Sequence, residues 1–108
     1  MNKRLKFSNS LVSLVLSGVK VSTWRLWDDK NLLTGDVIDF IEHGTNKHFA
    51  TAKLLKVIEK PMGQFTNEDK EGHEKFNNDN EMYETYTRYY GKKVNSETPV
   101  KIIWFKLV

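Results

Sequence analysis

The sequence predicts an α+β fold in which a small, partly closed mixed β-barrel carries two to three helices at its ends. Five or six segments have the alternating or β-branched pattern of strands, and segments with helical spacing interrupt them. The last segment, residues 98–108, is apolar on both faces, which is typical of a central strand. Several short strands around a buried last strand favour a curled sheet over an open one.

Strands dominate the first sixty residues, with one helix between the first two strands. Residues 3–7 alternate charged and apolar side chains, as a short edge strand does. The polar residues 8–10 can cap a helix whose apolar residues run to Leu16 and which ends at Gly18. Further strands are predicted, from β-branched or alternating residues bounded by turn residues, at residues 19–27, 37–42 and 49–59.

The remaining residues predict a short helical turn, a longer helix and the last strand. Pro61 ends the fourth strand, and residues 65–69 have the pattern of a capped helical turn. Asn80 can cap a helix that places tyrosines at three- and four-residue intervals and ends at Gly91. We see no internal repeat and no linker in this half of the chain.

Length and composition define the class of protein. At 108 residues there is room for one hydrophobic core, so residues 1–108 are expected to form a single domain. The chain has no cysteine, which excludes disulfides and thiolate metal sites and favours a reducing compartment. No apolar run is long enough to span a membrane, and no signal peptide is recognisable, so we expect a cytoplasmic protein.

Metal and cofactor sites are not predicted. His43, His48 and His73 lack the spacing and carboxylate support of metal ligands, and we interpret them as loop or surface residues. The glycine-rich fingerprints of nucleotide cofactors and the G-x-S-x-G elbow of serine hydrolases are also missing from the sequence.

The net charge of +3 is mild, but it is distributed unevenly. Residues 1–27 contain five basic residues and no acid, residues 59–84 contain eight acids, and the C-terminal end is basic again. Two basic ends around an acidic middle could form a surface that attracts phosphates. Ordinary solvated charge is the alternative interpretation.

A polar cluster lies in the predicted second strand. Alternation along a strand places Thr23 and Arg25 on one face and Ser22 and Trp24 on the other. A threonine hydroxyl becomes a nucleophile when a nearby base takes its proton, and a buried lysine such as Lys20 can be that base. The alternative is a strand threonine, with Lys20 as a surface charge and Arg25 as the ion-pair partner of Asp28 or Asp36.

Aromatic residues accompany this cluster. Trp24 and Trp27 could stack on bases beside the cations, as in proteins that bind single strands. Aromatic residues at strand or helix spacing more often belong to a core, and we place Tyr83, Tyr86 and Trp104 there.

Three stretches, taken in order along the chain, resemble the ASCH domain, a member of the PUA-like superfamily. Residues 17–25 are similar to its glycine-x-lysine-threonine-x-threonine-x-arginine signature, although Val21 stands where many members have threonine. Residues 33–38 resemble its glycine-aspartate before a strand. Residues 68–73, followed by the tyrosine-rich helix and the last strand, resemble its C-terminal part.

The resemblance implies a PUA-like barrel with a cleft lined by the first stretch, and recognition of RNA or a modified nucleoside. Some small single-domain members are N4-acetylcytidine amidohydrolases, which act without a cofactor. Carried over by motif, the nucleophile falls on Thr23, the lysine base on Lys20 and the acid on Glu71, with Glu74 as its alternative. The implied ligand-binding residues are Ser22, Trp24, Arg25 and Trp27.

A non-catalytic module is the competing prediction. The same cleft and basic surface would then bind single-stranded RNA, with an affinity that falls steeply as salt rises. For either function we expect no membrane partner and a monomer, with a dimer as the alternative.

Overall fold

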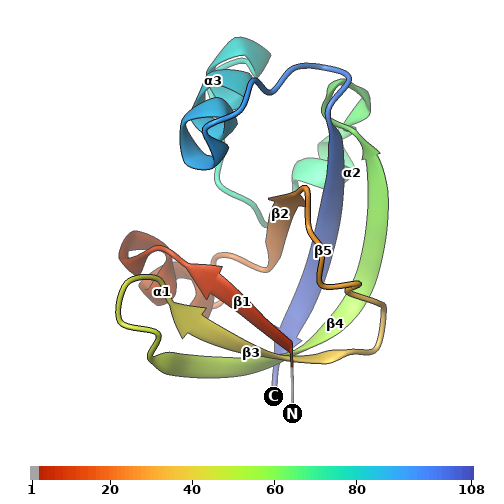
Figure 1. The fold of residues 1–108 in the computed structure, drawn as a ribbon. Helices are drawn as coiled ribbons and strands as arrows, with labels where there is room; N and C mark the ends of the chain where they lie inside the picture. The colour runs from red at the N-terminus through yellow and green to blue at the C-terminus, as the bar shows by residue number, and fades with distance from the viewer. Residues whose placement is uncertain (1–2) are drawn as a thin grey trace.

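The computed structural model describes residues 3–108, which form five strands, three α-helices and one short 3-10 helix (Figure 1). Among these residues no helix is both long and apolar enough to cross a membrane. In chain order the elements are β1 (Lys3–Phe7), α1 (Asn9–Leu16), β2 (Ser22–Leu26), β3 (Val37–Glu42), β4 (His48–Pro61), η1 (Met62–Gln64), α2 (Asn67–Lys70), α3 (Asp79–Tyr90) and β5 (Pro99–Leu107).

The five strands form one curled sheet in the order β1-β3-β4-β5-β2. The β1–β3 pair is parallel and the other pairs are antiparallel. The long β4 pairs with β3 through its first half and with β5 through its second, and its register with β5 shifts between Leu54 and Lys56. Because β4 pairs with both β3 and β5 and its register with β5 shifts, the sheet bends into a half-barrel. This confirms the predicted fold class.

Two of the predicted strands have the expected place in the sheet. β1 is an edge strand, and β5 lies between β4 and β2 with buried residues on both faces. β2 is shorter than predicted, because the N–H groups of Val21 and Ser22 bond to the Gly72 carbonyl at 2.9 and 3.2 Å. At its other end Trp27 takes a positive φ of 51°, which ends the strand.

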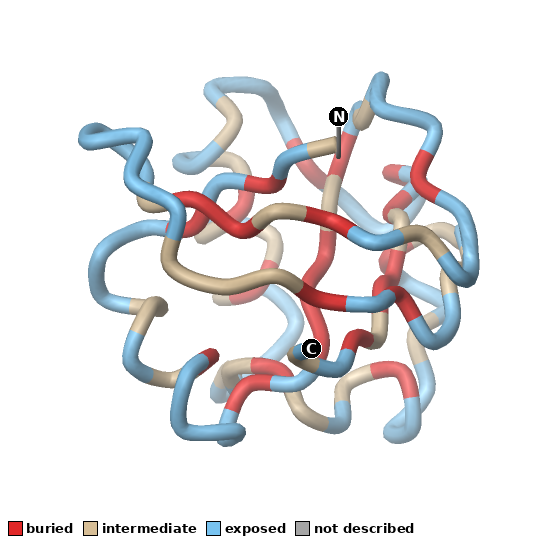
Figure 2. The backbone as a smooth tube through the Cα atoms, turned by 90° about the horizontal axis from the view of Figure 1, so that it is seen from below, coloured by how far each residue is buried: buried red, intermediate tan, exposed pale blue. Residues whose placement is uncertain are grey.

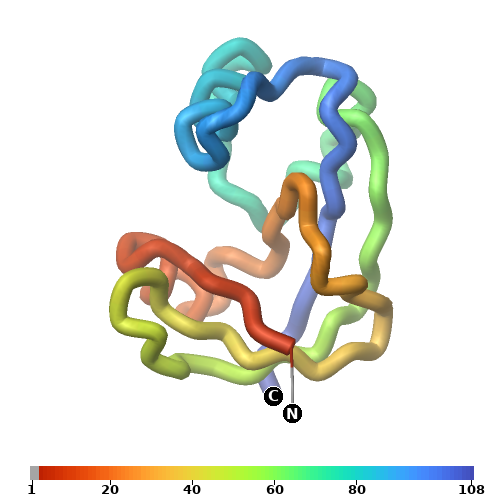
Figure 3. Tube along the Cα trace, in the orientation of Figure 1, coloured from red at the N-terminus to blue at the C-terminus, as the bar shows by residue number. Residues whose placement is uncertain are grey.

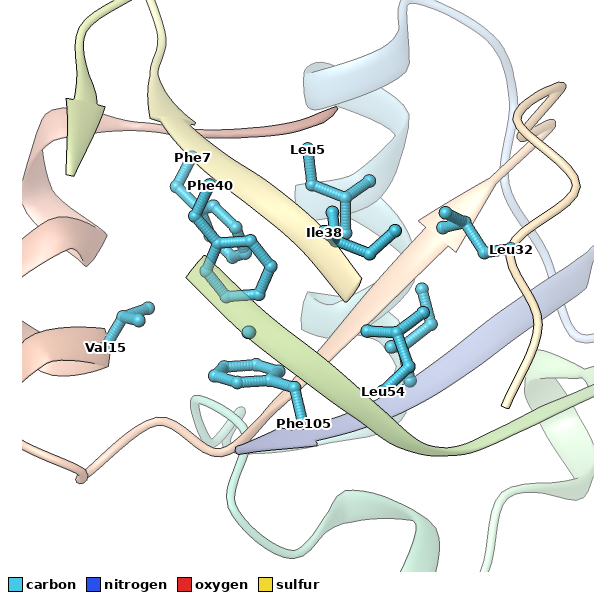
Figure 4. Close-up of a cluster of buried hydrophobic side chains, with 10 residues drawn as sticks. Leu5, Phe7, Val15, Leu32, Ile38, Phe40, Leu54 and Phe105 are labelled. Carbon is cyan, nitrogen blue, oxygen red and sulfur yellow. The ribbon is translucent and has the colours of Figure 1, made fainter. Parts of the chain in front are cut away.

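The inside of the barrel is filled by aliphatic and phenylalanine side chains (Figure 4). Phe7 and Phe40 pack at 4.6 Å between ring centroids, and Phe105 meets Phe40 edge-on at 4.9 Å. Seen from below, the buried stretches follow the strands and the loops around them are exposed (Figure 2). The buried members of this barrel core are Leu5, Phe7, Val15, Leu32, Ile38, Phe40, Ala52, Leu54, Ile103 and Phe105.

A second cluster joins α3 to the sheet. It contains aromatic and sulfur-containing side chains at its centre, including Trp24, Met62, Met82 and Tyr86. The helix begins two residues earlier than predicted, because Asn78, not Asn80, accepts the Glu81 N–H with its side chain. It ends at Gly91, as predicted, in the left-handed conformation with φ of 68°.

The loop between α2 and α3 runs past the start of β2 (Figure 3). Gly72 makes this approach feasible, because its φ is +74° and a Cβ atom there would overlap the Val21 side chain. Its carbonyl accepts both N–H groups from Val21 and Ser22, and the Ser22 hydroxyl bonds to the Glu71 carbonyl at 3.2 Å. The loop is therefore fixed to β2, and the residues after Gly72 lie over the start of that strand.

Candidate functional site

A cleft of about 370 Å³ lies where β2, the loop after α2 and the C-terminal half of α3 meet. This volume is within the range of small-molecule sites, roughly 300–1,000 Å³. Thr23 and Arg25 line it from alternate positions of β2, and Trp24 between them lines it as well. Lys20 enters from the turn before β2, and Glu74 from the loop after Gly72.

Lys20 and Glu74 form a buried ion pair in the cleft. Lys20 Nζ lies 2.8 Å from Glu74 Oε1, and the lysine side chain is only 3% exposed. The lysine is held by its backbone, because its N–H bonds to the Leu14 carbonyl at the end of α1 at 3.0 Å. The short turn through Gly18, with a φ of +82°, makes this return possible. Both partners therefore reach the cleft from well-fixed backbone.

The other oxygen of Glu74 is bound by a histidine. His73 Nδ1 lies 2.8 Å from Glu74 Oε2, and His73 Nε2 lies 2.9 Å from the Tyr86 hydroxyl. The arrangement assigns the proton to Nδ1, which faces two acceptors, the carboxylate and the Glu74 main-chain carbonyl at 3.0 Å, while Nε2 accepts from Tyr86. The imidazole also stacks on Trp24, with 3.6 Å between ring centroids and 8° between planes. A continuous chain of contacts thus runs from Tyr86 through His73 and Glu74 to Lys20.

The pKa values of the ion pair are shifted by this environment. Burial lowers the pKa of Lys20 below its usual value, and the attraction of Glu74 offsets only part of that effect. Burial alone would raise the pKa of Glu74, but its contacts with His73 and Lys20 outweigh burial and lower the pKa to about 2. The free protein at neutral pH therefore holds a Glu74 carboxylate against a lysine that releases its proton more readily than usual.

The flanking groups are neutral. Burial is the main cause that lowers the pKa of His73, so the imidazole is uncharged at neutral pH. Burial also raises the pKa of Tyr86 well above its usual value, which keeps its hydroxyl protonated and able to donate to His73. The negative charge of the cleft is thereby confined to Glu74.

The other candidate residues differ in where the structure places them. Ser22 is fully buried and bonds to the Glu71 carbonyl, so it holds the loop and does not line the cleft. The Glu71 side chain is exposed and lines an adjoining cavity between α2 and α3, which shares Trp24, Glu74 and Phe76 with the cleft. Trp27 is 47% exposed outside the cleft, 5.6 Å from the Tyr90 ring. Of the two carboxylates considered from the sequence, Glu74 is the one that meets Lys20.

Trp24 is more buried than the sequence suggested. Its indole is 3% exposed and belongs to the second cluster, with one face against His73 and an edge contact to Phe65. It therefore shapes the cleft wall and orients the imidazole, because little of the ring is free to stack on a base.

His73 and Tyr86 are site residues that the sequence interpretation missed. His73 was interpreted as a loop or surface residue, but it is buried in the loop between α2 and α3. Tyr86 lies in the core as predicted, yet its hydroxyl faces His73. The available signal was the order Glu-Gly-His-Glu at residues 71–74, in which a glycine allows close approach to β2. Within residues 3–108 no group of three side chains could hold a metal ion.

No protein-family model matches the sequence, and no curated protein matches it. The fold is nevertheless similar to solved structures. A DUF984-family protein from Enterococcus faecalis superposes with a TM-score of 0.77 at 18% identity, over 100% of this chain and 80% of that one. An ASCH domain from Lactobacillus crispatus gives a TM-score of 0.68 at 14% identity, over 92% of this chain and 70% of that one. A mutant ASCH protein from Zymomonas mobilis superposes with a TM-score of 0.67 at 10% identity, over 95% of this chain and 66% of that one.

The class defined by these similarities is a small α+β domain with a partly closed mixed barrel. More particularly, the chain has an ASCH-type fold. At such low identities the similarity concerns the fold, and the chemistry has to be argued from this chain's own residues.

Proposed function

We propose that this protein is an amidohydrolase that removes an acetyl group from the exocyclic amine of a modified nucleoside, with N4-acetylcytidine as its type substrate. The observation that carries the proposal is the Lys20–Glu74 pair, 2.8 Å apart in a cleft that Thr23 also lines. Hydrolysis of an amide through a threonine needs a nucleophile, a base and an acid, and these three residues supply one of each.

Substrate binding prepares the pair for reaction. When a ligand fills the cleft and displaces water, the charged pair becomes less favourable than a neutral amine beside a carboxylic acid. The proton then moves along the 2.8 Å contact from Lys20 Nζ to Glu74 Oε1. Burial lowers the pKa of Lys20, which favours the shift, whereas the pKa of Glu74, lowered to about 2 by its contacts with His73 and Lys20, opposes it until the ligand weakens those contacts.

In the first half of the reaction, Thr23 Oγ1 attacks the acetyl carbonyl and its proton passes to Lys20. The C–N bond breaks, the acetyl group stays on the threonine as an ester, and Glu74 protonates the departing amine. In the second half, water attacks the ester and gives a proton to the Glu74 carboxylate. Lys20 returns its proton to the threonine oxygen, and acetic acid is released. In this scheme Glu74 takes the role of the acid, in place of Glu71.

Binding of single-stranded RNA without catalysis is the second candidate. Trp27 is half exposed, and Lys92 Nζ lies 5.0 Å from its ring centroid. Tyr89, 71% exposed, lines the cleft nearby. Exposed aromatic rings beside cations are the usual platform for stacked bases. This surface would bind RNA whether or not the cleft is catalytic.

The experiment that tests the proposal is incubation of the purified protein with N4-acetylcytidine, followed by chromatographic measurement of cytidine and acetate. We expect cytidine from the wild type, none from Thr23→Ala, and partial activity from Thr23→Ser, which keeps the hydroxyl. Thr45→Ala, which removes an exposed hydroxyl in the β3–β4 turn, is the matched control and should retain full activity. Folded wild-type protein that releases no cytidine would reject this substrate and favour RNA binding.

A further inference from the structure

Arg25 lines the cleft without an ion-paired carboxylate, although Asp28 and Glu74 lie near enough to attract its charge. Among residues 3–108 no carboxylate forms an ion pair with its guanidinium, and its Nε is buried without a hydrogen-bond acceptor. Its close contact is with an aromatic ring, because the guanidinium carbon lies 4.7 Å above the Phe7 centroid. A guanidinium that is partly buried without an ion-paired carboxylate is costly, and an unsatisfied buried donor such as its Nε, in a cleft, points to a missing ligand.

Further basic side chains line the same cleft beside Arg25. Lys6 and His43 join it to form what we call the basic wall (Lys6, Arg25 and His43). Their proximity follows from Phe7, whose ring lies under Arg25 and whose carbonyl accepts the His43 N–H at 2.8 Å. Lys6 precedes Phe7 in β1 and has no ion-pair partner among the described residues.

The carboxylates of this region are already engaged. Glu42, next to His43, receives hydrogen bonds from Asn9 at 2.6 Å and from Thr45 at 2.8 Å, and it does not line the cleft. Glu74 does line the cleft, but it is already ion-paired: its Oε1 lies 2.8 Å from Lys20 Nζ, without hydrogen-bond geometry, and its Oε2 lies 2.8 Å from His73 Nδ1. Lys6 and Arg25 of the basic wall therefore carry positive charge without an ion-paired carboxylate among the described residues.

We propose that the basic wall binds a phosphate group, so that the ligand of the cleft is a nucleotide, free or within RNA, rather than an uncharged nucleoside. A planar guanidinium over an aromatic ring is well suited to bind phosphate oxygens in a fixed orientation. The nucleotide identity rests on the proposed function, whereas phosphate binding by the basic wall does not.

Binding measurements test this without relying on turnover. Calorimetry at low salt compares cytidine, cytidine 5′-monophosphate and a short oligocytidylate, and amide NMR shifts report binding of inorganic phosphate. We expect the monophosphate to bind about tenfold more tightly than cytidine, the gain of roughly one charge-assisted hydrogen bond. Inorganic phosphate should shift the amides of residues 6–8 and 43.

Variants locate the effect. Lys6→Gln and His43→Gln, both exposed and tolerant of change, should each lower the ratio of monophosphate to cytidine affinity about threefold. Lys53→Gln, an exposed lysine of β4 that does not line the cleft, is the matched control and should leave the ratio unchanged. Tighter binding of the oligocytidylate than of the monophosphate identifies RNA as the source of the phosphate, and equal binding identifies a free nucleotide.

Two other outcomes separate this inference from the proposed function. Binding of phosphate and of the monophosphate without any binding of cytidine or release of acetate would support the basic wall and reject the nucleoside hydrolase. Equal affinities for cytidine and its monophosphate, with phosphate leaving residues 6–8 and 43 unmoved, would overturn the phosphate site.

Discussion

Two lysine–carboxylate pairs with the same 2.8 Å separation lie in different regions of this molecule. In the Lys60–Asp69 pair the carboxylate is the buried partner, and it also accepts the Thr66 N–H in the capping box that begins α2. In the Lys20–Glu74 pair the lysine is the buried partner, 3% exposed, and the carboxylate faces the cleft.

The difference shows that an ion pair has a different effect when the carboxylate is the buried partner than when the lysine is. Burial of Asp69 with three hydrogen-bond contacts fixes a helix start, and those contacts outweigh desolvation to keep its pKa low. Burial of Lys20 lowers the pKa of an ammonium group, which makes its proton easier to move. The first arrangement stabilises structure, and the second is suited to proton transfer.

The largest expected effect comes from replacing each lysine by methionine. Lys20→Met should lower hydrolysis about 10²–10⁴-fold, the usual contribution of a positioned base. Its free energy of unfolding should also fall, by up to about 3 kcal/mol, because Glu74 loses its counter-ion and keeps only His73 and some contact with water. Lys60→Met should leave hydrolysis unchanged and lower the free energy of unfolding by about 1 kcal/mol. Product chromatography measures hydrolysis, and urea unfolding measures the free energy of unfolding. Equal loss of activity in both variants would contradict a specific role of the Lys20–Glu74 pair in hydrolysis.

A slightly smaller effect distinguishes the two candidate acids. Glu74→Gln should lower hydrolysis about 10²-fold, since an amide cannot protonate the leaving amine. Glu71→Gln removes an exposed carboxylate outside the cleft and should retain nearly full activity. The reverse result would return the acid to Glu71 and make the Lys20–Glu74 pair a structural one.

The free energy of unfolding at acidic pH is expected to depend on Glu74. The pKa of Glu74 is about 2 in the folded protein against 4.5 for the unperturbed group. Because the folded pKa is the lower one, its stabilisation is present above pH 4.5 and is lost as the pH falls towards 2. Solvent contact reduces this contribution to about 1–2 kcal/mol. Urea unfolding between pH 2 and 5 should be less pH-dependent in Glu74→Gln than in the wild type, and identical slopes would contradict the low pKa.

The sequence was sufficient for the barrel because its signals are local. The edge strand β1, the central strand β5 and the end of α3 at Gly91 follow from alternation, two-sided burial and a left-handed glycine. The Lys20–Glu74 contact could not be read in this way, because it joins residues far apart in the chain. It depends on the loop fixed by Gly72, and a one-dimensional motif leaves the choice between Glu71 and Glu74 open.

The smallest expected effect tests whether Tyr86, through His73, supports the Lys20–Glu74 pair. Tyr86→Phe removes the hydroxyl that donates to His73 Nε2 but keeps the aromatic packing of the second cluster. Without that donor the imidazole tautomer is less strictly fixed, so the hydrogen bond to Glu74 is populated less fully. We expect a three- to tenfold loss of hydrolysis with little change in substrate affinity. NMR of the ¹⁵N-labelled imidazole should show Nδ1 protonated in the wild type and a mixture of tautomers in the variant. An unprotonated Nδ1 in the wild type would mean that His73 does not hold the Glu74 carboxylate, and the pair in the cleft would then depend on Lys20 alone.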